Sequence, residues 1–274
     1  MLWENLTVLD FEKSVEACDG VCILPIGVME KHGNHLPLGT DMQIIRAVCE
    51  AAAKQEPVML FPYYYMGQIA EARHFSGTIA PSHRLVMDSL LEMCDEIGRN
   101  GFKKILIMNG HGGNEFFLPF FAQQMPHLDR DYVVYTKFVA HATAGQYKKI
   151  AEKAGHEDMG DHAGILETAL MMHLHPELVH MGEQSPDESE ALGRLDDTKK
   201  TGLFSGYDWY ADYPEHFAGD PTLATSELGE FILDIFVENT VKSIRAIKAD
   251  DKSLQFASEY IEYGNKPRAD RKFR

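Results

Sequence analysis

Cysteine is scarce in this chain of 274 residues, and basic residues are fewer than acidic ones. The four cysteines form no Cys-x-x-Cys pair, and a chain this long needs no disulfide staples, so we expect reduced thiols. With 26 basic and 42 acidic residues, the formal charge of −16 disfavours nucleic acid and anionic membrane surfaces as partners. The sequence also lacks an export signal and the roughly 18 consecutive apolar residues of a membrane span. We therefore expect a cytoplasmic protein.

Short apolar runs alternate along the chain with amphipathic patterns. Runs with the length and composition of buried strands lie at 21–28, 58–66, 104–110 and 132–140. Helical patterns occupy 41–55, 81–101, roughly 164–174 and 226–247. This alternation predicts an α/β fold with a largely parallel sheet that helices cover on both faces. We expect a single domain over residues 1–274.

Residues 183–222 fit neither pattern. Loops this long inside a compact domain are usually lids, binding loops or disordered segments. The second half of this one is too aromatic for disorder, because it contains Phe204, Tyr207, Trp209, Tyr210, Tyr213 and Phe217. We expect an ordered cover, hence a candidate lid, and the alternative is a surface excursion packed on the core.

Metal-binding types of side chain are concentrated at four places, because Glu30-x-His32 and Asp41 count as two within one stretch. Glu30, His32 and Asp41 lie within GVMEKHGNHLPLGTD at 27–41, which follows the first expected strand. His111 lies in NGHGGN at 109–114, and Glu167 lies in DHAGILE at 161–167. Each has a simpler explanation when taken alone, such as a hydrogen-bonded loop histidine or an exposed helix position, or a helix cap for Asp41.

The spacing of these residues favours one shared site. Residues i and i+2 of an extended segment point to the same side, so Glu30 and His32 can face a common point, to which the next turn returns Asp41. One aspartate can bridge two cations about 3.5–4 Å apart, the separation of two-metal hydrolytic sites. Three carboxylates and two imidazoles without a thiolate suit Zn²⁺, Mn²⁺ or Fe²⁺ rather than a structural zinc. A cation bound there would lower the pKa of its water toward ~7 and so supply hydroxide.

His162 is separate from this set and suits a general acid or base, because the pKa of histidine lies near neutrality. The alternative is a surface histidine that caps the following helix. The glycines of NGHGGN match no phosphate-binding spacing, and they would let the backbone turn sharply beside His111 and leave room for a substrate. Candidate residues of the substrate pocket are Gly112, Gly113, Asp161 and Trp209.

Three motifs together, LPIGVMEKHGNHLPLGTD, NGHGGN and HAGILETALMMHLHPELV, resemble those of the creatininase (creatinine amidohydrolase) family in order and spacing. The resemblance covers roughly residues 5–245. It implies a three-layer α/β/α sandwich, a homohexamer built as a trimer of dimers, and two divalent metal ions per chain. It further implies that one metal is bound by Glu30, Asp41 and His111 and the other by His32, Asp41 and Glu167. His162 matches the catalytic histidine of the family.

The interpretation is a metal-dependent amidohydrolase that cleaves a C–N amide, either a cyclic amide or a formamide, in a small polar metabolite. Creatininase itself has a tyrosine and a glutamate after the histidine of the NGH motif and a tryptophan before the catalytic histidine. Here Gly112 and Gly113 follow His111, and residues 156–164 contain no aromatic, which argues against creatinine as the substrate. The alternatives are a hydrolase of C–C bonds in cyclic diketo sugars and a non-catalytic metal-binding protein. His35 is expected to lie near the site without being a ligand.

Overall fold

A computed structural model describes residues 1–160, 162–185 and 188–266, and within them four parallel strands form one sheet in the order β2-β1-β3-β4. The strands are β1 (Val21–Ile26), β2 (Met59–Leu60), β3 (Lys104–Asn109) and β4 (Val133–Phe138). Ile26 pairs with Asn109, and Asn109 pairs with Phe138, so three strands end at the same level. The loops that follow them therefore meet at one edge of the sheet.

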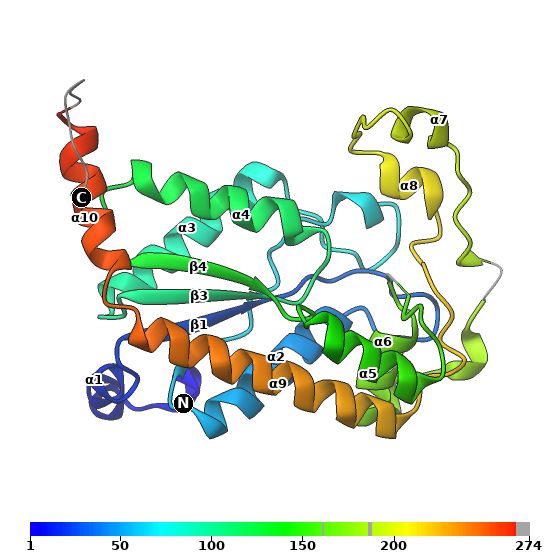
Figure 1. Ribbon diagram of the computed structural model, residues 1–274, viewed down its shortest axis with the longest axis horizontal. Coiled ribbons are helices and arrows are strands. Elements are labelled where there is room, and N and C mark those ends of the chain that lie inside the picture. The colour runs from blue at the N-terminus through cyan, green and yellow to red at the C-terminus, as the bar shows by residue number, and fades with distance from the viewer. Residues whose placement is uncertain (161, 186–187, 267–274) are drawn as a thin grey trace.

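Alternate residues of the central strands pack into two separate cores, because successive side chains of a strand point to opposite faces. One core joins the sheet to α2 (Thr40–Gln55), α6 (Ile165–Leu174) and α9 (Ser226–Ala249), and its strand residues are Val21, Ile23, Leu106 and Met108. The other joins it to α3 (His83–Arg99) and α4 (Asn114–Gln124), and its strand residues are Cys22, Leu24, Ile26, Ile105 and Ile107. The predicted three-layer α/β/α sandwich is confirmed, and Figure 1 shows the two helical layers on either side of the sheet.

The remaining helices lie around these layers. They are α1 (Val8–Ala17), α5 (Ala144–Ala154), α7 (Asp196–Lys199), α8 (Asp208–Asp212) and α10 (Ser253–Gly264). Short 3-10 turns occupy Trp3–Asn5, Ala70–Ala72, Met125–His127, Pro176–Leu178 and Met181–Glu183. No helix of the described residues has the length and apolar character that a membrane span requires.

The expected helices and three of the expected strands are found within a few residues of their predicted bounds. The predicted strand at 58–66 is wrong beyond Leu60, because further along the described chain contacts β1 through the Phe61 amide, which donates to the Ile23 carbonyl oxygen, and through a bridge between Ile26 and Tyr64. Pro62 has no backbone amide to donate, which explains why regular pairing stops there.

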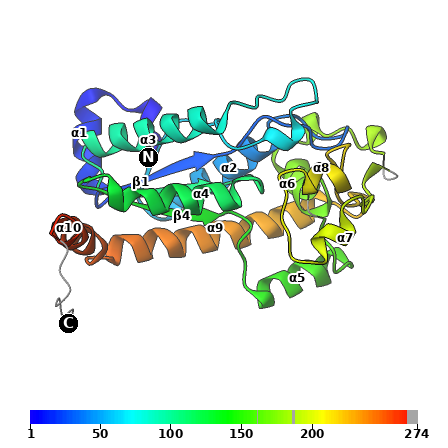
Figure 2. The ribbon, with the colours of Figure 1, turned by 90° about the horizontal axis from the view of Figure 1, so that it is seen from above.

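The segment expected as a cover contains α7 and α8 in its described part and lies near the carboxyl ends of the strands. Figures 1 and 2 both show α7 and α8 at the end of the molecule opposite α10. Residues 186–187 of the segment and residues 267–274 of the expected domain lie outside the described residues. Its function as a lid, like the single-domain assignment, stays a prediction.

Gly229 of α9 allows the closest approach between α9 and α6, since a Cβ built on it would lie 1.9 Å from the carbonyl oxygen of Ala169. We expect Gly229→Ala to force these helices apart and to lower the free energy of unfolding by ~1–3 kcal/mol, as overpacking does. Urea denaturation measures the change. Gly145→Ala is the matched control, because its Cβ would meet no atom closer than 4.0 Å. A Gly229→Ala protein as stable as the wild type contradicts the prediction.

Candidate metal centre

The five predicted metal ligands come together at the carboxyl edge of the sheet. They are supplied by the loop after β1 (Glu30 and His32), the first turn of α2 (Asp41), the loop after β3 (His111) and the first turn of α6 (Glu167). Ligand atoms of Glu30, Asp41 and His111 lie within 4.8 Å of one another, and so do those of His32, Asp41 and Glu167. Asp41 belongs to both groups, which are the two that the family resemblance implies.

Two glycines let these loops pack directly on the start of α2. A Cβ on Gly27 would lie 2.7 Å from the backbone nitrogen of Met42, and one on Gly110 would lie 2.9 Å from the carbonyl oxygen of Asp41. Larger residues would therefore push both loops away from Asp41. Asn109 then holds the turn of His111, because its side chain accepts from the His111 amide at 3.0 Å and donates to the His111 carbonyl at 2.8 Å.

Backbone carbonyls determine which ring nitrogen of His32 and of His111 could bind a cation. His32 Nδ1 lies 3.3 Å from the carbonyl oxygen of Glu30, and His111 Nε2 lies 2.9 Å from that of Gln68. Because a carbonyl oxygen can only accept, these nitrogens donate, and the opposite ring nitrogens, His32 Nε2 and His111 Nδ1, are the ones that could bind a cation. These nitrogens face carboxylates, since His32 Nε2 forms a 3.1 Å hydrogen bond with Asp41 Oδ1 and His111 Nδ1 is 2.7 Å from Glu30 Oε1. Because a carboxylate oxygen only accepts, His32 Nε2 bears a proton here, which a bound cation would displace.

Two carboxylate oxygens at the centre of the cluster are buried without a hydrogen-bond partner among the described residues. These atoms are Glu30 Oε1 and Asp41 Oδ2. Both approach His111 Nδ1, at 2.7 and 3.3 Å, but without the angles of a hydrogen bond. Uncompensated buried carboxylates are costly, and a cation among these oxygens and nitrogens would remove that cost. The donor set therefore fits divalent metal ions.

The pKa shifts show the same need for positive charge. Although burial lowers it, the neighbouring Asp41 and Glu167 raise the pKa of His32 to about 10. Glu30 and Asp41 likewise outweigh burial and raise the pKa of His111 well above its usual value. Burial raises the pKa of Glu167 to about 7. Protons on the two histidines supply positive charge to the cluster, and bound cations would replace them.

His162 lies against this cluster, and its ring centroid is 4.2 Å from that of His32. Its Nε2 lies 2.8 Å from the carbonyl oxygen of Lys31 and so donates, which leaves Nδ1 as a proton acceptor. Burial, followed by the charge of His32, lowers its pKa to about 3, and the imidazole is therefore neutral near pH 7. The alternative of a surface capping histidine is wrong, because His162 is only 7% exposed and α6 has no side-chain cap in the described structure.

The candidate pocket residues differ in their positions. Gly112 is exposed, and a Cβ on Gly113 would clash at 2.5 Å with Glu71 Oε1 and His111 Nε2. Trp209 lies with its ring centroid 6.0 Å from that of His162. Asp161 lies outside the described residues.

His35 is fully buried and its Nε2 lies 3.0 Å from Thr168 Oγ1, so it packs against α6 beside the cluster.

Two further side chains approach the cluster that no sequence motif indicated. The imidazole of His216, 2% exposed, bonds to Glu30 Oε2, and Glu71 Oε1 lies 4.0 Å from His111 Nε2. His216 lies in the segment without periodicity and Glu71 in a short turn, and neither has a spacing relative to the motifs that would identify it. Only the folded chain brings them to the site.

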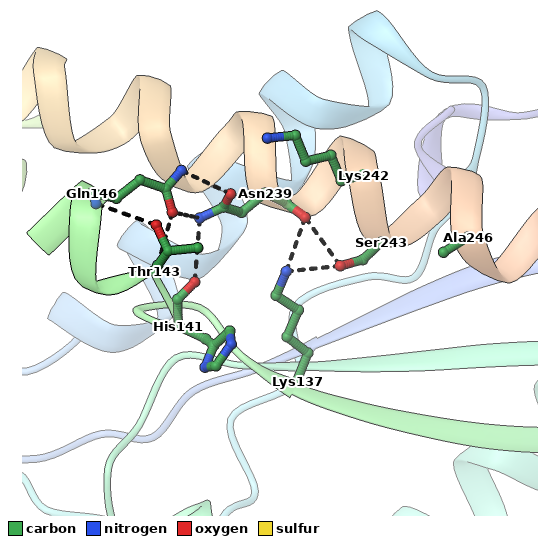
Figure 3. Close-up of a pocket in the computed structure, with 8 residues that line it drawn as sticks. All are labelled: Lys137, His141, Thr143, Gln146, Asn239, Lys242, Ser243 and Ala246. Atoms are coloured by element: carbon green, nitrogen blue, oxygen red, sulfur yellow. Dashed lines mark hydrogen bonds between the residues drawn. The ribbon is translucent and has the colours of Figure 1, made fainter.

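A surface pocket of about 230 Å³ between β4, α5 and α9 is a separate feature (Figure 3). It is lined by Lys137, His141, Thr143, Gln146, Asn239, Lys242, Ser243 and Ala246, and none of these is an acid or a cysteine. Lys137 donates to the carbonyl oxygen of Asn239 and to Ser243, and the side-chain amides of Gln146 and Asn239 bond to each other. The pocket shares no residue with the metal cluster, which remains the candidate site.

Comparison with protein families gives a match to the model described as "Creatininase: Creatinine amidohydrolase" over residues 4–244. Creatinine amidohydrolase of Pseudomonas putida is 26% identical over 260 residues, which cover 88% of this chain and 95% of that protein. The 3-dehydro-scyllo-inosose hydrolase of Thermotoga maritima is 24% identical over 267 residues, covering 89% and 83%. The mycofactocin precursor peptide peptidase of Mycobacterium ulcerans is 30% identical over 235 residues, covering 81% and 83%.

Solved structures of creatininase share the fold. One described as the manganese form superposes with a TM-score of 0.73 at 23% identity, covering 91% of this chain and 99% of that one. A mutant creatininase of Zn–Zn type also has a TM-score of 0.73 at 23% identity, covering 91% and 98%. The whole sandwich, rather than a local motif, is therefore similar.

The sharing of Asp41 by both groups predicts unequal effects of two carboxylate substitutions. We expect Asp41→Asn to lower the metal content at both positions, because it removes the charge that both groups face, and Glu167→Gln to lower it at one. Elemental analysis of the purified variants measures the metal per chain. Asp95→Asn, which alters a carboxylate that pairs with Arg130 away from the site, is the control. Full metal content in Asp41→Asn would refute the shared position.

Removal of bound metal should lower thermal stability, because it returns uncompensated charge to a buried cluster. We expect a chelator to lower the Tm and added Zn²⁺ or Mn²⁺ to restore it. Differential scanning calorimetry at several metal concentrations measures the shift. The same treatment of Asp41→Asn should change its Tm far less, and an equal shift in both proteins would show that the metal acts elsewhere.

Proposed function

The chain belongs to the creatininase family of hydrolases, and from this premise we propose that it is a dinuclear metal-dependent amidohydrolase. Its substrate would be a C–N amide, cyclic or formyl, in a small polar metabolite. The observation that carries the proposal is the direction of the two Asp41 oxygens, since Oδ1 faces His32 at 3.1 Å and Oδ2 faces His111 at 3.3 Å. A carboxylate held in this way has one oxygen available for each of two cations.

In this proposal each cation has its own set of ligands. Glu30, Asp41 and His111 hold one, and His32, Asp41 and Glu167 hold the other, with Zn²⁺, Mn²⁺ or Fe²⁺ as the candidate ions. When bound, such a pair of ions supplies hydroxide at neutral pH and polarises the carbonyl group of the substrate. Glu167 is also oriented by the chain itself, because its Oε2 accepts from the Ala163 amide at 2.6 Å.

His162 is the proposed catalytic residue. Its Nε2 is anchored on the carbonyl oxygen of Lys31, so Nδ1 can take up a proton in the site. In amide hydrolysis this proton would pass to the leaving nitrogen, which must be protonated before the C–N bond breaks. The backbone of His162 is fixed as well, through two 3.0 Å hydrogen bonds with Ala218.

The relatives support two other substrate bonds that the same centre could cleave. The Thermotoga maritima hydrolase acts on 3-dehydro-scyllo-inosose, which favours cleavage of a cyclic diketo sugar, and the Mycobacterium ulcerans enzyme is a peptidase. Gly112 has open space at its Cβ, which gives a substrate bulkier than creatinine room at this turn. A non-catalytic metal-binding protein would keep the cations without turnover.

We also propose a cytoplasmic homohexamer arranged as a trimer of dimers. The assembly is supported by the family resemblance, and the compartment is supported by the cysteines at positions 18, 22, 49 and 94, which are all buried and unpaired.

Product analysis separates these candidate reactions. A panel of cyclic amides, formamides, short peptides and cyclic diketones is incubated with the metal-loaded protein, and released amine is measured. We expect amine from one of the amide classes, because only C–N cleavage frees a nitrogen. A turned-over cyclic diketone without amine would favour C–C cleavage instead, and an inert panel would favour the binding protein.

His162→Asn should lower kcat by ~10²–10⁴-fold, while metal content stays at the wild-type value. The reason is that His162 moves a proton and holds no cation in the proposed site. Steady-state kinetics on the substrate found above, together with elemental analysis, measure both quantities. Wild-type kcat in this variant would remove His162 from the mechanism.

A further inference from the structure

His216 has a backbone conformation that few side chains adopt. Its φ is +52°, in the left-handed region that favours glycine, and its ring is nevertheless only 2% exposed. Non-glycine residues held in this region cost free energy and persist where the surroundings require them, often at functional sites. This conformation places the ring of His216 between Trp209 and Glu30.

The ring of His216 joins Trp209 to the metal cluster. The indole Nε1 of Trp209 donates to His216 Nδ1 at 2.9 Å. Since an indole nitrogen can only donate, Nδ1 accepts and the proton lies on Nε2. His216 Nε2 then donates to Glu30 Oε2. Both ring nitrogens of His216 are thus occupied, since Nδ1 accepts from Trp209 and Nε2 donates to Glu30, so His216 does not serve as a further ligand.

This hydrogen bond determines how Glu30 can bind a cation. Glu30 is fully buried, and its Oε2 is taken by His216. Its Oε1 is then the oxygen that faces the cluster, where it lies 2.7 Å from His111 Nδ1 and 4.0 Å from His32 Nε2 and has no hydrogen-bond partner among the described side chains. A carboxylate fixed at one oxygen cannot rotate that oxygen toward a cation.

We propose that Trp209 and His216 form a positioning relay that orients Glu30 for the metal shared by Glu30, Asp41 and His111. The relay rests on the proposed dinuclear site and adds to it a link between the aromatic segment and one metal position. Among the described contacts neither Trp209 nor His216 is hydrogen-bonded to His32, Asp41 or Glu167, so we expect the relay to act mainly on the metal that Glu30 binds.

The segment that carries the relay is attached to the body of the protein on both sides of His216. Lys31 pairs with Glu215 at 3.3 Å, and His74 Nε2 donates to the carbonyl oxygen of Pro214 at 2.8 Å. After His216, the backbone of Ala218 bonds to that of His162. These contacts keep Trp209 and His216 over the site, and they allow the segment to control the Glu30 carboxylate.

Two substitutions test the relay without straining the backbone. His216→Gly keeps φ at +52° without steric cost and removes the imidazole, while Trp209→Phe keeps an aromatic ring, makes it smaller and removes the N–H donor. Tyr210→Phe is the matched control, because it removes a polar atom from the neighbouring residue of α8 and leaves the relay intact. Zn²⁺ or Mn²⁺ is titrated into each metal-free protein against a competing chelator, and the Tm of each metal-free protein is recorded.

We expect wild type and Tyr210→Phe to bind two metals per chain with the same affinities. His216→Gly should bind one metal with unchanged affinity and the other ~10–100-fold more weakly, the usual effect of removing an outer partner of a metal ligand. Trp209→Phe should shift the same metal by a smaller factor. These changes should appear without a matching loss of Tm in at least one of the two metal-free variants.

Three outcomes overturn the relay. Two metals bound with wild-type affinities in both variants would overturn it while leaving the dinuclear site intact. Equal weakening of both metals, accompanied by a lower Tm of both metal-free variants, would show a structural role only. A wild-type protein that binds no metal would overturn the proposed function and the relay together.

Discussion

The site is organised around buried carboxylate oxygens that the protein alone does not satisfy. Asp41 directs one oxygen toward His32 and the other toward His111, and Glu30 Oε1 lies unpartnered beside them. Buried charge of this kind is destabilising unless it is paired, and here it lies at the centre of a cluster in which Glu30, His32 and Asp41 are buried. Cation binding is the arrangement that turns this cost into stabilisation, and the surrounding loops are shaped to hold it.

The sheet explains why the cluster can exist. Strands β1, β3 and β4 end at the same level, so loops far apart in the sequence meet there, as ligand sites of parallel sheets do. Gly27 and Gly110 then let those loops pack on the first turn of α2, and Gly229 lets α6 pack closely on α9. Packing that is this close leaves the ligands little freedom, which suits a centre whose two groups share one aspartate.

The histidines around the site are distinguished by the direction in which they present their protons. Backbone carbonyls accept from one ring nitrogen each of His32, His111 and His162, which leaves the other nitrogen of each ring directed elsewhere. His216 differs because Trp209 donates to its Nδ1, which leaves the proton on Nε2. This nitrogen then donates to the Glu30 carboxylate. In the proposed site the same type of side chain would thus serve as a ligand, as a proton acceptor or as a positioning donor according to its partner.

The sequence by itself determined the α/β class and the residues expected at the site, because hydrophobic periodicity and ligand chemistry are local properties, and its resemblance to a known family implied the two ligand groups. It misjudged the strand at 58–66, where Pro62 ends the pairing, and it gave no sign of His216 or Glu71. Those two residues reach the site from a segment and a turn without periodicity. Only the tertiary structure decided their places, and with them the proton position of each histidine, because both depend on atoms brought close by folding rather than by spacing along the chain.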